Sequence, residues 1–247
     1  MTPRRDFIQK MGSLLLLPML NTNPLFVMLQ SSTLPPGIGT APDYSGPLPK
    51  VPKGGTLGNR PPLNSEERIA KAIITRAPVG PTPFAVAKFF LEISNGKFGQ
   101  IWQPYAQGWP VRWNPVIVNF FQATNTTPEG DLTAWCAAFV NWCFLHIGKG
   151  MATQSASSGS FRMFGIETHT PTVGDLVVFR RATPDGTHDE RGHVGFYVRS
   201  TADEIEVLGG NQIEGVEGCH KISSKPFTKS GQKLIFHSYR TDPRLHA

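Results

Sequence analysis

The sequence predicts an α+β fold in which N-terminal helices pack on an antiparallel β-sheet. Apolar residues recur at helical spacing up to about Gly150, and beyond it they alternate with polar residues in short segments. Turn-forming Gly, Asp and Pro residues separate these later segments. A period near 3.6 residues indicates helices, and a period of two indicates strands buried on one face. Helices followed by a run of antiparallel strands define the α+β class.

Boundary signals mark four helices before the period changes. The first begins at Asn64 and ends before Pro78, because proline cannot continue a helix. The others are expected at residues 84–93, from Asn114-Pro115 onward, and from about Trp135 onward.

Short alternating segments mark the strands of the second half. The clear ones are residues 176–179, 194–198, 205–208 and 234–239, with residues 219–222 as a candidate fifth.

The first 30 residues have the composition of an export signal. Arg4 and Arg5, with Phe7 close behind, resemble a twin-arginine signal, and four leucines follow at residues 14–17. We therefore expect export to the periplasm or out of the cell. The alternative is an amphipathic helix that is never cleaved. The apolar stretch is too short to cross a bilayer comfortably, so no stable membrane span is expected.

Residues 31–63 separate this segment from the folded part of the chain. They are rich in Pro, Gly, Ser and Thr and poor in large apolar residues, so they cannot bury enough surface to offset their ordering entropy. We expect a linker there. The folded domain is expected at residues 64–240, with a core at 84–240 preceded by a helical extension.

Charge and cysteine content limit the classes of partner and compartment. The net charge is +6, with no run of five basic residues, which gives little support to nucleic-acid binding. A basic protein is also attracted to an anionic polymer such as a bacterial cell wall. Three cysteines cannot form a fully paired disulfide framework. A Cys143–Cys219 bridge stays an alternative in an oxidising compartment.

Cys136 is the candidate nucleophile. It lies at the opening of the fourth predicted helix, for which Asp131 and Thr133 are candidate N-caps. The positive end of a helix dipole favours thiolate, so we expect a lowered pKa for this thiol. The alternative is a buried cysteine that serves as a small hydrophobe. His193 on a predicted strand and Asn211 in a Gly-rich segment follow it, which is the order of parts in a papain-like thiol hydrolase.

Four motifs together resemble the CHAP branch of the NlpC-like amidases and peptidases. They are WCAAFVNWC at 135–143, PTVGDLVVF at 171–179, GHVGFYV at 192–198 and LGGNQ at 208–212. The resemblance covers roughly residues 84–240. It implies a papain-like core and a bacterial enzyme that cleaves peptidoglycan, either as an N-acetylmuramoyl-L-alanine amidase or as a stem-peptide endopeptidase. The alternatives are a non-catalytic cell-wall binding module and a thiol acyltransferase on the same fold.

The resemblance assigns three catalytic roles by position. Cys136 would be the nucleophile, His193 the general base, and Asn211 the residue that holds the imidazole in the useful tautomer. Many family members have a glutamate two residues before this asparagine, where this chain has Gly209. The third role therefore falls to Asn211, with Gln212 or Glu214 as alternatives.

Substrate contacts are expected from the neighbours of these residues. Gly192 would keep the surroundings of His193 open, Gln212 follows the orienting residue, and Trp135 would line the cleft unless it packs in the core. The backbone N–H of Cys136 is expected in the oxyanion hole.

We expect no cofactor and no metal. Asp185, His188, Asp189, Glu190 and His193 lie near one another in the sequence, but they lack the spacing of zinc or EF-hand sites. The implied partner is peptidoglycan, without nucleic acid. An immunity or inhibitor protein is added only if the enzyme is a toxin delivered into rival cells.

Overall fold

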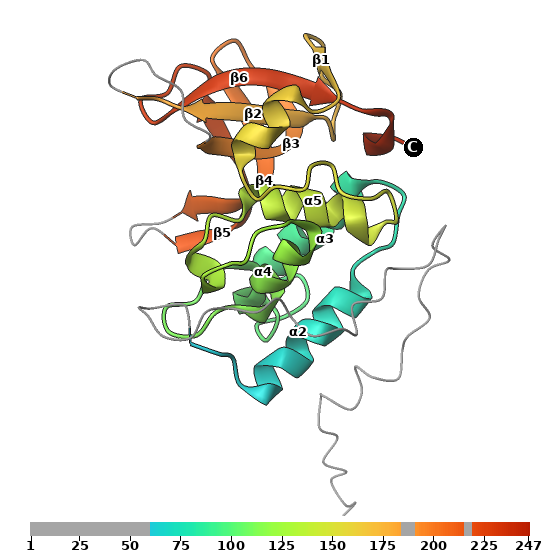
Figure 1. The fold of residues 1–247 in the computed structure, drawn as a ribbon, viewed down its shortest axis with the longest axis vertical. Helices are drawn as coiled ribbons and strands as arrows, with labels where there is room; N and C mark the ends of the chain where they lie inside the picture. Colours follow the sequence, from blue (N-terminus) through green and yellow to red (C-terminus); the bar gives the residue numbers. More distant parts are fainter. Residues whose placement is uncertain (1–59, 184–190, 215–218) are drawn as a thin grey trace, which may run out of the picture. The chain divides into compact units, whose positions relative to one another are not determined.

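A computed structural model describes residues 60–183, 191–214 and 219–247. Within these residues, helices come first and a six-stranded antiparallel sheet follows, which confirms the α+β class (Figure 1). The predicted signal segment and residues 31–59 of the predicted linker lie outside the described residues. The last linker residues are held by backbone hydrogen bonds, since the Trp113 N–H donates to the Arg60 carbonyl at 2.9 Å.

The helices begin and end close to the positions that the sequence indicates. Thr82 and Asn114 cap the second and third of them, because their side-chain oxygens accept the Ala85 and Val116 N–H groups. The α-helices of the described residues are α2 (Asn64–Arg76), α3 (Pro83–Ser94), α4 (Pro115–Phe120) and α5 (Cys136–His146).

The predicted caps of α5 are wrong. Trp135 occupies the N-cap position and makes no side-chain capping bond. Asp131 instead accepts the backbone N–H groups of Trp109 and Asn114, each at 2.8 Å, and Thr133 accepts the Glu129 N–H at 2.7 Å. These side chains fasten the loop that leads to the helix. The N–H groups at the start of α5 are therefore left without a capping side chain.

The sheet has the order β1-β6-β2-β3-β4-β5. Its first strand was not predicted, because three residues with two exposed side chains give no alternation to detect. The candidate strand at 219–222 is part of a longer one. The strands are β1 (Ile166–Thr168), β2 (Leu176–Arg181), β3 (Gly192–Ser200), β4 (Glu204–Glu214), β5 (Cys219–Thr228) and β6 (Leu234–Thr241).

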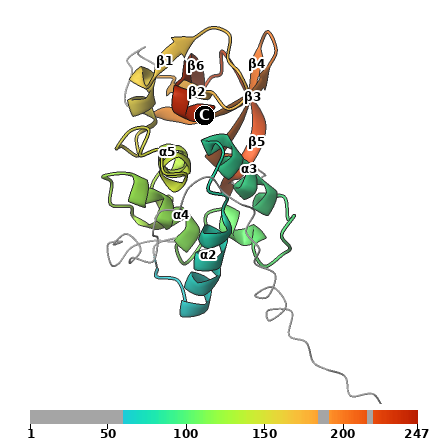
Figure 2. The same cartoon turned by 90° about the vertical axis from the view of Figure 1, so that its right-hand side faces the viewer.

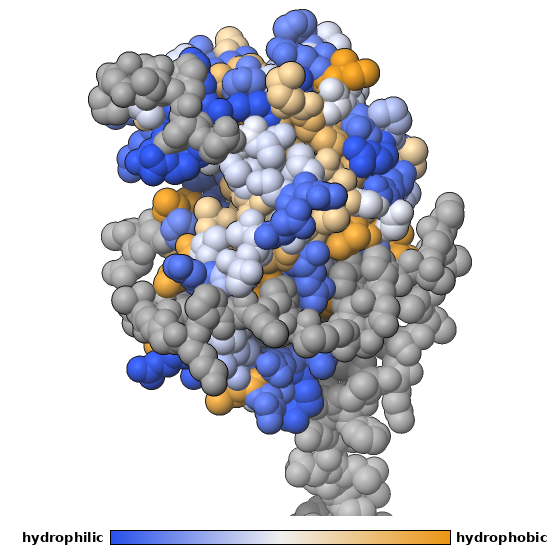
Figure 3. All heavy atoms as spheres, in the orientation of Figure 1, coloured by the Kyte–Doolittle hydropathy of each residue, from blue (hydrophilic) through white to orange (hydrophobic). Residues whose placement is uncertain are grey.

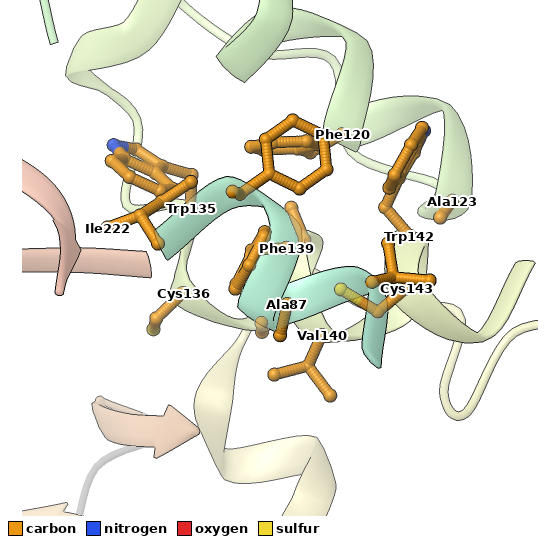
Figure 4. Close-up of a cluster of buried hydrophobic side chains, with 14 of the residues drawn as sticks. Ala87, Phe120, Ala123, Trp135, Cys136, Phe139, Val140, Trp142, Cys143 and Ile222 are labelled. Carbon is orange, nitrogen blue, oxygen red and sulfur yellow. The ribbon is translucent and has the colours of Figure 1, made fainter. Parts of the chain in front are cut away.

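Helix α5 lies between the sheet and the remaining helices (Figures 1 and 2). It contacts β3 and β4 on one side and α3 and α4 on the other. Ten of its eleven residues are buried, so its apolar surface is continuous rather than confined to one stripe. Its aromatic side chains pack with Phe90 and Phe120, with ring centroids 5.2 to 6.0 Å apart (Figure 4).

The strands bury both faces of the sheet. Along β2, Leu176 and Val178 belong to the main core with α5, whereas Val177 and Phe179 belong to a second, smaller cluster. Successive side chains on a strand point to opposite faces, so this division follows from the pleat. The strands that carry the candidate site are thus held from both sides.

Candidate active site

Cys136 is the first residue of α5 and is 3% exposed. Figure 4 shows its side chain leaving the helix start on the side away from Trp135 and Phe120. Burial raises the pKa of the Cys136 thiol, although backbone N–H groups of Val194, Ala137 and Cys136 itself act to lower it. The expected lowering of this pKa is therefore wrong for the free protein. Loss of solvation outweighs the favourable N–H groups at the helix start.

His193 lies in β3 and is 5% exposed. Its ring stacks on Phe227 of β5, with centroids 5.2 Å apart and planes inclined by 24°. Its Nε2 atom lies 3.3 Å from Nε2 of Gln212. Burial lowers the pKa of His193 to about 4, and the positive charge of Lys225 adds to this effect. The imidazole is therefore neutral near pH 7.

The sulfur of Cys136 reaches the strand of His193 through the backbone. The N–H of Val194, the residue after His193, hydrogen-bonds the sulfur. The imidazole itself contacts Gln212 and Phe227. A direct pairing of thiol and imidazole therefore stays a prediction. The free protein combines a neutral thiol with a neutral ring.

Asn211 and Gln212 have different partners. Oδ1 of Asn211 lies 2.7 Å from Nδ1 of His220, and the Asn211 backbone has a φ of 58°. The register of β4 against β5 shifts between Gly209 and Gln212, as in a β-bulge. A one-residue shift reverses which side chains face each side of a sheet. The amide that meets His193 is consequently that of Gln212, which is 2% exposed.

The third alternative, Glu214, forms an ion pair with Lys221. Burial raises the pKa of Glu214, but hydrogen bonds from Lys221 and Ser223 together with the lysine charges lower it overall. The structure thus records no contact of this carboxylate with His193 among the described residues. The role of Asn211 as the residue that orients His193 stays a prediction, and Gln212 is now a second candidate for that role.

Gly209 and Gly210 shape the surroundings of these side chains. A Cβ atom at Gly209 would lie 2.6 Å from Gln212 Nε2 and 3.2 Å from His193 Nε2. A Cβ atom at Gly210 would lie 2.4 Å from the Trp135 ring. A side chain at position 209 would therefore point at the place where the Gln212 amide meets the imidazole. In the sequence, the signal for this close packing was the pair of glycines directly before Asn211, the predicted partner of His193.

The two remaining predicted contact residues have structural surroundings. Trp135 is fully buried and packs near Phe120, with ring centroids 6.2 Å apart. Its indole nitrogen has no hydrogen-bond partner in the described part of the chain. A Cβ atom at Gly192 would lie 2.0 Å from the Phe179 carbonyl oxygen, so glycine allows β2 to approach β3 closely. Neither observation tests a contact with substrate.

The described residues contain no group of three or more His, Cys, Asp or Glu side chains that could hold a metal ion. Most of the acidic and histidine cluster noted in the sequence lies at residues 184–190, outside the described ranges. Cys136, Cys143 and Cys219 are free thiols.

Within residues 60–183, 191–214 and 219–247, no helix is long and apolar enough to cross a membrane. On the face shown in Figure 3, hydrophilic and apolar residues are interspersed over the described part.

Residues 126–211 match the family model of the CHAP domain. The match begins ahead of the loop that carries Asp131 and ends at Asn211, so it includes both Cys136 and His193. No curated protein and no solved structure matches the chain significantly.

Proposed function

Because the chain contains a CHAP domain, a domain of peptidoglycan-hydrolase-like amidases and peptidases, we propose that it is a cysteine hydrolase of peptidoglycan. The bond cleaved is the amide between muramic acid and L-alanine or an amide within the peptide stem. One observation carries the proposal: the sulfur of Cys136, at the start of α5, accepts a hydrogen bond from the strand residue that follows His193.

The chemistry follows from these groups. The thiol gives its proton to the imidazole, and the thiolate forms a bond to the carbonyl carbon of the substrate amide. The carbon–nitrogen bond then breaks, and the amine leaves with the proton from the ring. Water, deprotonated by the ring, attacks the thioester and releases the carboxylate product and the thiol. The N–H groups of Cys136 and Ala137, which lack a capping side chain, would stabilise the negative oxygen of each tetrahedral intermediate.

Gln212 supplies the orienting partner of His193 in this proposal. Its amide contacts Nε2 of the imidazole, which leaves Nδ1 for the exchange of a proton with the thiol. The amide also fills the space in front of Gly209, where many relatives have a glutamate. A neutral amide from a different position would thus take over the place of that carboxylate.

The decisive experiment is incubation of purified peptidoglycan with the wild-type protein and with Cys136→Ala. Wild type should release soluble fragments, and Cys136→Ala should release none above background. Cys219→Ala is the matched control, because it removes a half-buried thiol from β5 and should keep full activity. New amino or carboxyl termini, identified by mass spectrometry, distinguish an amidase from an endopeptidase.

Other results would redirect the proposal. Fragment release by Cys136→Ala would exclude the thiol mechanism. Binding to the wall without cleavage by wild type would favour a non-catalytic binding module. Products extended by an acyl group would favour a thiol acyltransferase.

Export completes the proposal, because peptidoglycan lies outside the cytoplasm. The twin-arginine-like pattern at Arg4 and Arg5 supports delivery to the periplasm or beyond.

A further inference from the structure

Two buried polar side chains form a chain behind His193. Oγ of Ser223 donates to Oε1 of Gln212 at 2.9 Å, and Nε2 of Gln212 lies 3.3 Å from the ring of His193. Ser223 is 5% exposed and Gln212 is 2% exposed. A buried polar group without a partner is costly, so side chains in such a chain constrain one another strongly.

The hydrogen bonds determine which end of the Gln212 amide faces the imidazole. Nε2 of Gln212 also donates to the Val207 carbonyl at 3.2 Å, and a carbonyl oxygen accepts only. The Ser223 hydroxyl occupies the amide oxygen. The amide therefore presents an N–H to Nε2 of His193. Nε2 of His193 must therefore be unprotonated in order to accept this N–H, and the single proton of the neutral ring lies on Nδ1.

We propose that Ser223 is a positioning residue: its hydroxyl fixes the direction of the Gln212 amide and thereby decides which ring nitrogen of His193 carries the proton. The inference about catalysis rests on the proposed function, whereas the inference about the ring proton does not. With Nδ1 protonated, His193 cannot take a proton from Cys136 through that nitrogen. The resting arrangement is thus a closed state of the acid–base pair.

Ser223 has a second acceptor that provides the open state. Its hydroxyl hydrogen-bonds Glu214, but it carries a single proton for Glu214 and Gln212. When the Ser223 hydroxyl donates its hydrogen bond to the Glu214 carboxylate, its oxygen is left to accept a hydrogen bond from the Gln212 amide N–H. The amide of Gln212 then turns over. Its oxygen accepts a hydrogen bond from an N–H at Nε2 of His193; the single ring proton has moved from Nδ1 to Nε2, and Nδ1 is unprotonated. The turned amide loses its bond to the Val207 carbonyl, so the closed arrangement prevails in the free protein.

The charged and titratable groups around the ring come from three elements. Lys225 of β5 donates to the Ile213 carbonyl and places its charge near His193. Glu214 of β4 pairs with Lys221 and borders Ser223. Cys136 of α5 meets the neighbouring backbone. Removal of the Ser223 hydroxyl leaves Lys225 and Cys136 in place and takes one hydrogen bond from Glu214, which keeps its ion pair with Lys221.

Nitrogen-15 spectra of the histidine rings test the proposal on the intact chain, with the His193 signals assigned by their loss in His193→Gln. In wild type, Nδ1 should carry the proton. Ser223→Ala should move part of the population to the Nε2 tautomer and shift the titration of His193 upward by about one pH unit, because a turned amide accepts from the charged ring. Ser223→Thr keeps the hydroxyl and should titrate like wild type.

Two controls separate positioning from general damage. Ser224 is adjacent on β5, but its hydroxyl donates to Glu206 at 2.9 Å, so Ser224→Ala should leave His193 unchanged. In a Gln212→Ala background, Ser223→Ala should add no further shift, because the hydroxyl acts through the amide. Wild-type tautomer and titration in Ser223→Ala would overturn the proposal, as would independent, additive shifts in the double variant.

The same variants assayed on peptidoglycan connect the ring proton to turnover. Ser223→Ala should raise hydrolysis by up to about tenfold, in line with a shift of about one pH unit, because it populates the arrangement in which Nδ1 can accept the thiol proton, with Ser224→Ala at the wild-type rate. If wild type hydrolyses no peptidoglycan, the proposed function fails while the ring spectra still decide the role of Ser223. If hydrolysis by Ser223→Ala equals wild type although its tautomer changes, the catalytic part of the inference is wrong.

Discussion

Gly209→Ala and Gly210→Ala place the same methyl group at adjacent positions of β4, in opposite directions. The methyl group at position 209 would enter the contact between Gln212 and His193, at 2.6 Å and 3.2 Å from their Nε2 atoms. Neither glycine has a positive φ, so alanine fits the backbone at both positions. The two substitutions therefore differ only in the side chains that they displace.

The contacts predict different outcomes for the two variants. At position 209 the closest atom is the end of a flexible side chain, so the Gln212 amide can move away while the fold survives. We expect turnover to fall about a hundredfold, at the lower end of the range for acid–base positioning. At position 210 the methyl group meets the rigid, buried Trp135 ring at 2.4 Å and 2.7 Å and the Phe139 Cβ at 3.0 Å. Overpacking of this kind destabilises by about 1–3 kcal/mol.

Denaturant unfolding, followed by tryptophan fluorescence, measures the free energy of unfolding of both variants. Clearing of a peptidoglycan suspension measures their turnover per folded molecule. Gly210→Ala should be the less stable protein and Gly209→Ala the less active one. Wild-type turnover in Gly209→Ala would refute the role of the Gln212 amide. A larger loss of stability in Gly209→Ala than in Gly210→Ala would refute the packing argument.

Three further predictions concern other parts of the chain. Burial raises the pKa of Asp131 from 3.8 to about 6, so wild type should lose about 3 kcal/mol of stability between pH 4 and pH 7. Denaturant unfolding measures the free energy of unfolding across this pH range, and this free energy should change less with pH in Asp131→Asn than in wild type. An equally steep change in the variant would contradict the raised pKa of Asp131. Asn211→Gly keeps the positive φ and removes the amide; in the peptidoglycan assay it should lose less turnover than Gln212→Ala, and the reverse order would make Asn211 the orienting residue. Replacing Arg4 and Arg5 together by lysine should abolish export of a reporter fused to residues 1–35, and unimpaired export would exclude the twin-arginine signal.

Local patterns in the sequence were sufficient for the fold class and for the candidate nucleophile. The change of apolar period near Gly150 separates helices from strands, and both periods come from residues within a few positions of one another. The boundary residues Thr82 and Asn114 act within one helical turn, so their caps are also local. The CHAP motifs, read together, predicted the domain whose family model matches residues 126–211.

The partners of the candidate histidine depend on tertiary structure. A bulge between Gly209 and Gln212 decides that Gln212, not its neighbour Asn211, meets His193. Strand periodicity cannot locate such a one-residue shift, although the shift exchanges the faces of all later side chains. The partner of Asp131 is likewise a loop far away in the sequence, which is why this residue is not the cap of α5.

The order of the elements and the place of Cys136 at the start of a helix follow from local sequence patterns, because hydrophobic period and turn residues act over a few positions. The protonation of the site depends instead on tertiary packing. The pKa of Cys136 is raised and that of His193 is lowered to about 4, and burial is the largest cause in both cases. Helices and strands that are far apart in the sequence together remove solvent from these two side chains. A local sequence pattern therefore cannot indicate how deeply they are buried.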